Sequence, residues 1–265
     1  MDTIDREREV AAAFVAARRE ARALADYPGV RPENLAASYR IQDCALSLDG
    51  RAVVGWKVGR INAPADALLG ANRLAGPVFA GSVADGARGC VPDMPVFASG
   101  FAAAEAEFLL HVPGSTSGSV PATNDEAKAI VDEVRLGIEV ASSPYPGINV
   151  DGPCVTVSDY GNNGGLVMGP ALANWRDIDL CAVPVRTEID GEIVGQATAA
   201  TMLDGPYGAV RFLLANLAAR GIGWDAGIWV STGAVTGVHE IRPDQLAVAT
   251  FGDFGSIACR IVATA

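Results

Sequence analysis

Two acidic residues lie one position apart in an otherwise apolar segment of the chain, FAAAEAEFLLHV. On a strand, Glu105 and Glu107 would point to the same face, because side chains alternate along extended backbone. One interpretation is an edge strand whose acidic face meets solvent. The apolar flanks favour a buried strand instead, where two unpaired like charges would be costly. A divalent cation between the carboxylates would remove that cost.

A third acidic residue, Glu139, lies in similar surroundings, in the segment VRLGIEVAS. Taken alone, it could be a buried acid that is hydrogen-bonded to the backbone. Together with Glu105 and Glu107 it would complete a site whose ligands are all oxygen atoms. Such a site favours a hard cation, Mg²⁺, Mn²⁺ or Ca²⁺, over zinc.

A single lysine, Lys57, lies among apolar residues in the segment GWKVG. It could extend its ammonium to solvent and keep its stem on apolar surface. Alternatively it is an acid/base with a tuned pKa, or a charge partner for the three acids. Three carboxylates, one ammonium and a divalent ion sum to zero charge, which suits a buried site.

The surrounding sequence predicts the elements that would position these residues. Helices are expected over 3–25, 33–48, 64–69, 124–133 and 207–220; strands over 51–61, 134–141 and a hairpin at 186–197, with further strands in 76–122 and 228–263. The best local signals are a capping box, Thr123 to Glu126, and the turn Asp190-Gly191. We therefore expect an α+β protein, with a small helical N-terminal part (1–75) and a larger β-rich part (76–265) that form one continuous functional unit.

The composition excludes several classes of function. Acidic residues outnumber basic ones by 31 to 20, and the net charge of −11 argues against nucleic-acid partners. No apolar run reaches the roughly 18–20 residues of a membrane span, and MDTIDREREV lacks the order of a secretion signal, so we expect a cytoplasmic protein. The chain has only two histidines, which argues against catalysis by a Ser-His-Asp triad and against a metal site built from histidines.

A family resemblance emerges from the order of these segments. GWKVG, EAEFLL, GIEVASS, SDYGNNGGLVMGP and GIWVSTGAVTG…FGDFGS resemble, in the same order, the 2-keto-4-pentenoate hydratase branch of the fumarylacetoacetate hydrolase superfamily, which includes 2-hydroxypentadienoate hydratases and 4-oxalocrotonate decarboxylases. The likeness runs from about residue 35 to the C-terminus. It implies a mixed β-roll with inserted helices and a homo-oligomer.

The resemblance also implies roles for individual residues. The implied catalytic residues are Lys57 and Asp159; the ligands of Mg²⁺ or Mn²⁺ are Glu105, Glu107 and Glu139; the substrate-binding residues are Asn162, Thr232 and Gly233. The segment 70–76 lacks the acid that the family usually has there, and its Arg73 is expected to bind a second substrate carboxylate.

The implied activity is that of a lyase acting on a small anionic 2-keto acid, of the kind met in the catabolism of aromatic compounds. The leading expectation is a hydratase that adds water to a 2-hydroxy-dienoate or 2-keto-4-enoate through an enolate. The alternatives in the superfamily are a decarboxylase of the 4-oxalocrotonate type and a carbon–carbon hydrolase of the acylpyruvate type. The hydrolase is disfavoured because its N-terminal histidine motif is missing. A non-catalytic metal-binding scaffold is the alternative from another class.

Overall fold

A computed structural model describes residues 3–264, except for the side chain of Arg88. The helices are α1 (Thr3–Arg19), α2 (Leu35–Asp49), α3 (Ala65–Leu69), α4 (Asn124–Ile130), α5 (Pro153–Ser158) and α6 (Gly205–Ala219). The strands are β1 (Val53–Arg60), β2 (Arg73–Phe79), β3 (Val83–Asp85), β4 (Asp93–Val96), β5 (Phe101–Val112), β6 (Glu133–Ser143), β7 (Asn163–Ala171), β8 (Pro184–Ile189), β9 (Glu192–Thr198), β10 (Ile228–Ser231), β11 (His239–Glu240), β12 (Leu246–Phe251) and β13 (Ser256–Ala263).

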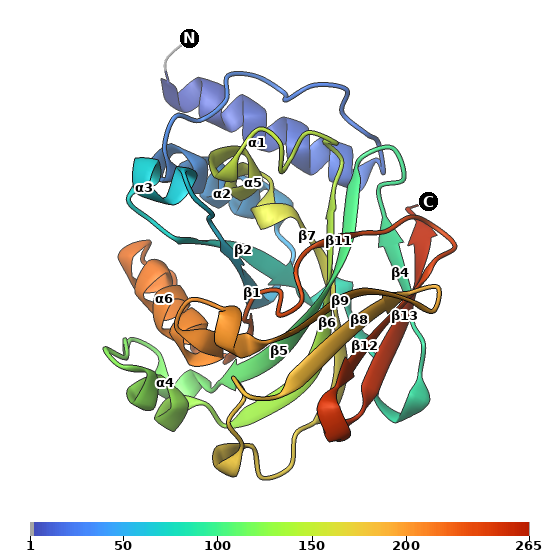
Figure 1. The fold of residues 1–265 in the computed structure, drawn as a ribbon. Helices are drawn as coiled ribbons and strands as arrows, with labels where there is room; N and C mark the ends of the chain where they lie inside the picture. The colour runs from blue at the N-terminus through green and yellow to red at the C-terminus, as the bar shows by residue number, and fades with distance from the viewer. Residues whose placement is uncertain (1–2, 265) are drawn as a thin grey trace.

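These strands form two mixed sheets, and helices pack around them (Figure 1). Sheet A has the order β2-β1-β10-β5-β6-β7-β3, with β11 paired to β5, and sheet B has the order β4-β13-β12-β8-β9. Figure 1 shows α1, α2, α3 and α5 together at one end of the molecule, and α4 and α6 beside each other at another. The predicted α+β class with a mixed β-roll is confirmed.

The alternation of side chains along β5 separates an apolar face from a polar one. Ala104, Ala106 and Phe108 belong to the main core, and the Phe108 ring meets Phe251 of sheet B edge-on at a centroid distance of 5.2 Å. The intervening positions carry the two acids. Sheet B therefore covers one face of the strand, and the acids point away from it.

The N-terminal helices form a second apolar cluster. Phe14 of α1, Ile41 of α2 and Val155 of α5 pack with Phe79 of β2 and with Tyr160, which follows α5. Through these contacts, the N-terminal segment is packed directly against the elements that carry the polar face.

The predicted helix over 3–25 ends early, at Arg19. Ala21 adopts a positive φ of 51°, and the N–H of Leu24 donates to the carbonyl of Pro144 at 2.8 Å, so the chain leaves the helix to dock on a distant loop.

The predicted hairpin is confirmed, with Asp190 and Gly191 at φ 51° and 85° in its turn.

The two parts predicted for the chain share sheet A. Strand β1, within 1–75, lies between β2 and β10, and β2 itself crosses the predicted boundary at residue 75. The division at that residue stays a prediction.

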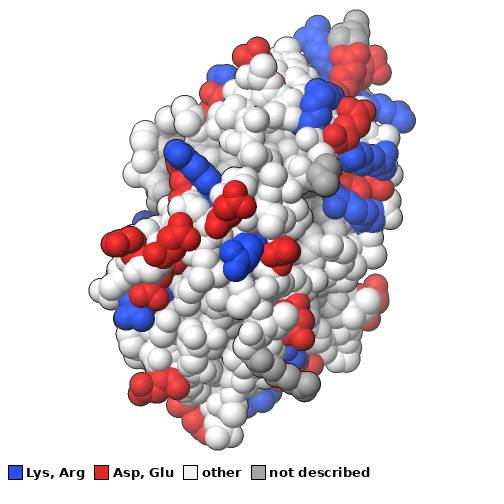
Figure 2. Space-filling view, turned by 90° about the vertical axis from the view of Figure 1, so that its right-hand side faces the viewer, with Lys and Arg blue, Asp and Glu red and all other residues white. Residues whose placement is uncertain are grey.

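The surface carries both charge signs. Figure 2 shows a face on which acidic and basic side chains are interspersed, without an extended basic patch. Among the described residues, no helix combines the length and the apolar character that crossing a membrane requires.

Candidate metal centre and active-site cavity

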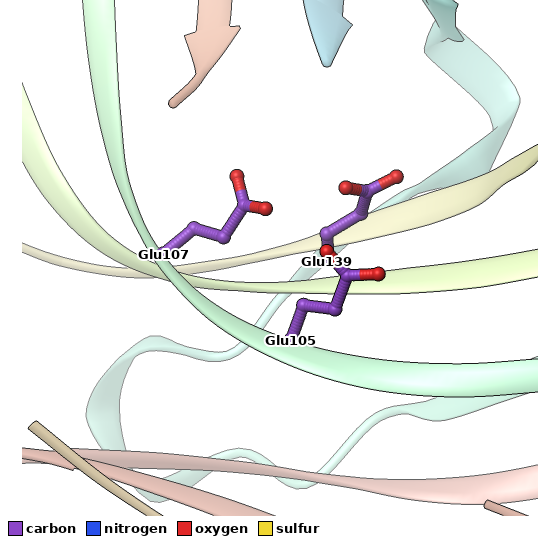
Figure 3. A group of neighbouring side chains, drawn as sticks. All are labelled: Glu105, Glu107 and Glu139. Atoms are coloured by element: carbon purple, nitrogen blue, oxygen red, sulfur yellow. The ribbon is translucent and has the colours of Figure 1, made fainter. Parts of the chain in front are cut away.

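Strands β5 and β6 bring the three predicted ligands together. The strands are antiparallel, and Glu105 lies directly opposite Glu139 in their register, with Glu107 two positions along β5. Figure 3 shows the three carboxylates directed into a common space. All three side chains are buried, and one carboxylate oxygen from each lies within 4.8 Å of the others. Because β5 lies between β10 and β6, the solvated edge strand is excluded.

Hydrogen bonds from the chain satisfy only part of this cluster. The hydroxyl of Ser231 and the N–H of Gly233 donate to Oε2 of Glu107 at 2.5 and 2.9 Å, and Nδ2 of Asn163 donates to Oε1 of Glu139 at 2.9 Å. Among the described residues, Oε1 of Glu107 is buried without a hydrogen-bond partner, and Oε2 of Glu139 accepts no hydrogen bond although the ammonium of Lys57 lies 3.4 Å from it. Buried oxygens in this state are costly, and a divalent cation would satisfy them, so the triad fits the predicted hard cation.

The lysine of β1 lies beside the triad. Nζ of Lys57 is 3.4 Å from Oε2 of Glu139 and donates to Oδ1 of Asn162 at 3.3 Å. The residue is only 4% exposed, which excludes the interpretation that its ammonium extends to solvent. Strand β1 pairs with β10 so that Lys57 lies opposite Ser231, the residue that binds Glu107. One side of sheet A thus carries the whole polar cluster.

Burial and mutual repulsion shift the protonation of this cluster. Burial, reinforced by Glu139, raises the pKa of Glu105 to about 7 although Lys57 lowers it, and burial with two neighbouring carboxylates raises the pKa of Glu107 well above its ordinary range. Burial alone would lower the pKa of Lys57, but the three carboxylates outweigh it and the pKa is raised. Without a cation, Glu105 and Glu107 therefore hold their protons to higher pH than free glutamates do, and the lysine stays charged.

The cluster forms one wall of a cavity of about 780 Å³. Six of the nine predicted site residues line it: Lys57, Arg73, Glu105, Asn162, Thr232 and Gly233. Glu107 and Glu139 belong to the same triad as Glu105 but are not among the residues that line the cavity. The hydroxyl of Thr232 donates to the carbonyl of Phe108 at 2.8 Å.

The structure places Asp159 in a different environment from the cavity lining. Its carboxylate accepts two hydrogen bonds from Arg18 of α1, at 2.6 and 2.9 Å, and one from the hydroxyl of Ser143 at 2.6 Å. The side chain is fully buried in this ion pair. Its predicted catalytic role stays a prediction, and the observed contacts are those of a structural anchor.

Two arginines lie at the cavity, opposite each other on β1 and β2. The guanidinium of Arg73 pairs with Asp204, which also binds Arg211 at 2.8 Å. Arg60 is the cross-strand neighbour of Arg73 and is exposed, with no acidic partner among the described residues. Of the two arginines, Arg60 therefore has no acidic partner among the described residues, whereas Arg73 has one; the expected binding of a substrate carboxylate by Arg73 stays a prediction.

Several polar contacts in the site were missed by sequence reasoning. Ser231 and Asn163 bind the carboxylates, and Arg60 and Asn149 line the cavity. Ser231 and Asn163 had a usable signal, because each is adjacent to a residue that was predicted. Arg18 had none, since it lies on a helix that carries many charged residues.

Known proteins share this fold and part of this sequence. No protein-family model matches the chain. It is 31% identical over 134 residues to a 4-oxalocrotonate decarboxylase of Pseudomonas putida (51% of this chain, 50% of the relative) and 29% identical over 153 residues to that of Pseudomonas sp. strain CF600 (58% and 55%). The alignments span only about half of these relatives.

Solved structures match over a longer stretch at lower identity. The 4-oxalocrotonate decarboxylase from Pseudomonas putida G7, complexed with magnesium and adipate, gives a TM-score of 0.80 at 21% identity and covers 97% of this chain and 98% of its own. Fumarylpyruvate hydrolase from Pseudomonas aeruginosa, in complex with Mn²⁺ and pyruvate, gives a TM-score of 0.59 at 15% identity. This match covers 81% of this chain and 91% of the hydrolase. These matches concern the fold. Together with the sequence relatives they confirm the predicted resemblance to the fumarylacetoacetate hydrolase superfamily.

Proposed function

We propose that this chain of the fumarylacetoacetate hydrolase superfamily is a divalent-metal-dependent lyase that removes CO₂ from a small unsaturated 2-keto dicarboxylate, a reaction of the 4-oxalocrotonate decarboxylase type. The observation that carries the proposal is the buried triad of Glu105, Glu107 and Glu139, with Lys57 beside it at the wall of a cavity. The names of the relatives favour decarboxylation over the hydration expected from the motifs.

The triad would hold Mg²⁺ or Mn²⁺. When bound, the cation would supply Lewis-acid stabilisation of the negative charge that develops on the 2-oxo group of the substrate. The contacts that Ser231, Gly233 and Asn163 make with the carboxylates would keep the ligands oriented.

Lys57 would provide the proton. As the bond to the leaving carboxylate breaks, its electron pair moves along the conjugated chain to the 2-oxygen and gives an enolate, while CO₂ departs. Although burial lowers the pKa of Lys57, the three carboxylates of the metal-free centre raise it, and the position of Nζ beside the triad would allow it to donate a proton or a hydrogen bond to this enolate. The contact with Asn162 orients the ammonium.

Arg60 would select for a second carboxylate. It is the exposed cation of the cavity without an acidic partner among the described residues, in a protein whose net charge of −11 otherwise repels anions. A dicarboxylate would thus be bound at both ends, by the metal centre and by Arg60.

Hydration of a 2-hydroxy-dienoate is the second candidate. The amides of Asn149 and Asn162 are hydrogen-bonded to each other at 3.0 Å and line the cavity, where they could orient a water molecule. A carbon–carbon hydrolase is less well supported, because the cavity lining among residues 3–264 includes no histidine. The homo-oligomer and the cytoplasmic location stay predictions.

One assay separates these activities. Metal-loaded protein would be incubated with 4-oxalocrotonate, 2-hydroxypenta-2,4-dienoate and an acylpyruvate, while CO₂ release and the ultraviolet absorbance of each acid are followed. We expect CO₂ from 4-oxalocrotonate, lost in excess EDTA. Consumption of the dienoate alone would establish the hydratase instead, and metal binding without turnover of any acid would leave only the scaffold.

A matched pair of lysine variants tests the proton donor. Lys57→Met removes the ammonium beside the triad, whereas Lys128→Met removes one on α4 that donates to the carbonyl of Arg176 and lies 5.9 Å from the Tyr207 ring. We expect turnover to fall by about 10²–10⁴-fold in Lys57→Met and to be unchanged in Lys128→Met. Full turnover by Lys57→Met would exclude it as the acid/base.

A further inference from the structure

The segment that follows α5 has an unusual backbone. Tyr160, Gly161 and Asn162 all have positive φ, at 55°, 62° and 57°. Only glycine adopts this left-handed region readily, and other residues persist there when their surroundings hold them. We refer to these three residues as the left-handed turn.

This turn delivers two amides to the metal centre. Oδ1 of Asn162 accepts from Lys57, and the next residue, Asn163, donates to Glu139. The turn also packs closely on β2, where a Cβ at Gly76 would lie 2.0 Å from the carbonyl oxygen of Tyr160. Any relaxation of the turn would therefore move Asn162, the partner of Lys57. It would also move Asn163, the partner of Glu139.

The guanidinium of Arg18 holds both ends of the turn. Nε and Nη2 bind the two carboxylate oxygens of Asp159, immediately before the turn, at 2.6 and 2.9 Å. Nη1 donates to the carbonyl of Asn163, immediately after it, at 3.2 Å. Nη2 also donates to the carbonyl of Ser142 at the end of β6, the strand that carries Glu139, at 3.0 Å. The Tyr160 ring lies 5.2 Å from the guanidinium carbon.

We propose that Arg18 is a positioning residue for the metal centre. By joining Asp159, Asn163 and β6, its planar fork fixes the left-handed turn in the conformation that orients Glu139 and Lys57. Arg18 is absent from the cavity lining, so it acts through these residues and makes no contact with substrate. The inference rests on the proposed function only in taking the triad as the metal site.

The test measures Mn²⁺ binding without substrate. In Arg18→Ala, we expect Mn²⁺ affinity, followed by electron paramagnetic resonance, to fall by about tenfold, with a changed spectrum of the bound ion. The neighbouring Arg19→Ala is the matched control, because Arg19 donates to the carbonyls of Leu48 and Asp49 on α2 and not to the turn. Its Mn²⁺ affinity should equal that of the wild type.

A second pair of variants separates positioning from loss of stability. Val10→Ala removes buried apolar volume from α1 but no hydrogen bond to the turn, and should lower Tm while keeping Mn²⁺ affinity. Arg18→Lys keeps the charge but cannot form the fork, and should still bind Mn²⁺ more weakly than the wild type, which covers the case in which Arg18→Ala does not fold.

Two results would overturn the inference: wild-type Mn²⁺ affinity and spectrum in folded Arg18→Ala or Arg18→Lys, or an equal loss of affinity in Val10→Ala. These results are distinct from a failure of the proposed function. If no keto acid is turned over but Arg18→Ala weakens Mn²⁺ binding, the activity is wrong and the positioning role stands.

Discussion

Glu105 and Glu139 lie directly opposite each other on adjacent antiparallel strands in the interior of sheet A. Like charges in this cross-strand position destabilise a sheet, and both side chains are buried. The metal-free centre is therefore an unfavourable arrangement that protons relieve in part and a divalent cation would relieve further. This relationship makes stability and pH the first tests of the centre.

The stabilisation by metal should grow with pH. The pKa of Glu105 is raised from 4.5 to about 7 in the folded chain, so the folded state binds the additional proton between these values. A carboxyl group whose pKa is raised by folding contributes to the free energy of unfolding. For Glu105 this stabilisation is fully present below the pKa of the unfolded chain and is lost as pH rises through about 7. We expect the difference in Tm between Mg²⁺ and EDTA samples to be larger at pH 8 than at pH 5.5. An equal or smaller difference at pH 8 would contradict the protonation assigned to the metal-free centre.

Removal of one ligand should abolish tight metal binding. In Glu105→Ala, we expect Mn²⁺ affinity to fall by more than about 100-fold, since loss of an outer-shell partner alone costs 10–100-fold. Isothermal titration calorimetry would measure the affinity, with Glu192→Ala, exposed on β9, as the control. Unchanged affinity in Glu105→Ala would exclude this residue from the ligand set.

The hydroxyl of Ser231 should matter although it is not a ligand itself. It donates to Oε2 of Glu107 at 2.5 Å and is fully buried, so in Ser231→Ala the N–H of Gly233 is the one hydrogen bond that the described residues still give this oxygen. We expect a loss of Mn²⁺ affinity of about tenfold and little change in Ser256→Ala, which lies exposed on β13. Equal affinities in the two variants would show that the ligand is held without Ser231.

Local patterns predicted the parts of the site that belong to single strands. The alternation in β5 placed Glu105 and Glu107 on one face, and the Asp190-Gly191 turn placed a hairpin. Pairing between distant segments has no such local signal. Strand β1 lies parallel to β10, which places Lys57 beside Ser231, and no pattern within either strand encodes that neighbour.

The environment of Asp159 depends on a still more distant contact. The polar, glycine-rich loop alone predicted only a turn, and the catalytic role of Asp159 came from the family resemblance. The structure pairs its carboxylate with Arg18, a residue of α1 with the same helical pattern as its charged neighbours. Buried ion pairs between remote elements arise from tertiary packing, and for this reason the sequence predicted the loop without its anchor.

Arg60 should determine the preference for dicarboxylates. It lines the cavity and has no acidic partner among the described residues, so Arg60→Ala would lose a hydrogen bond to a charged group, worth about 1.5 kcal/mol. We expect KM for 4-oxalocrotonate to rise about tenfold. If the monocarboxylate 2-hydroxypenta-2,4-dienoate is also turned over, its KM should be unchanged. Arg242→Ala, which removes an exposed arginine outside the cavity lining, is the control for net charge. A similar rise of KM for both acids in Arg60→Ala would mean that Arg60 attracts anions in general, and an unchanged KM for 4-oxalocrotonate would place its second carboxylate elsewhere in the cavity.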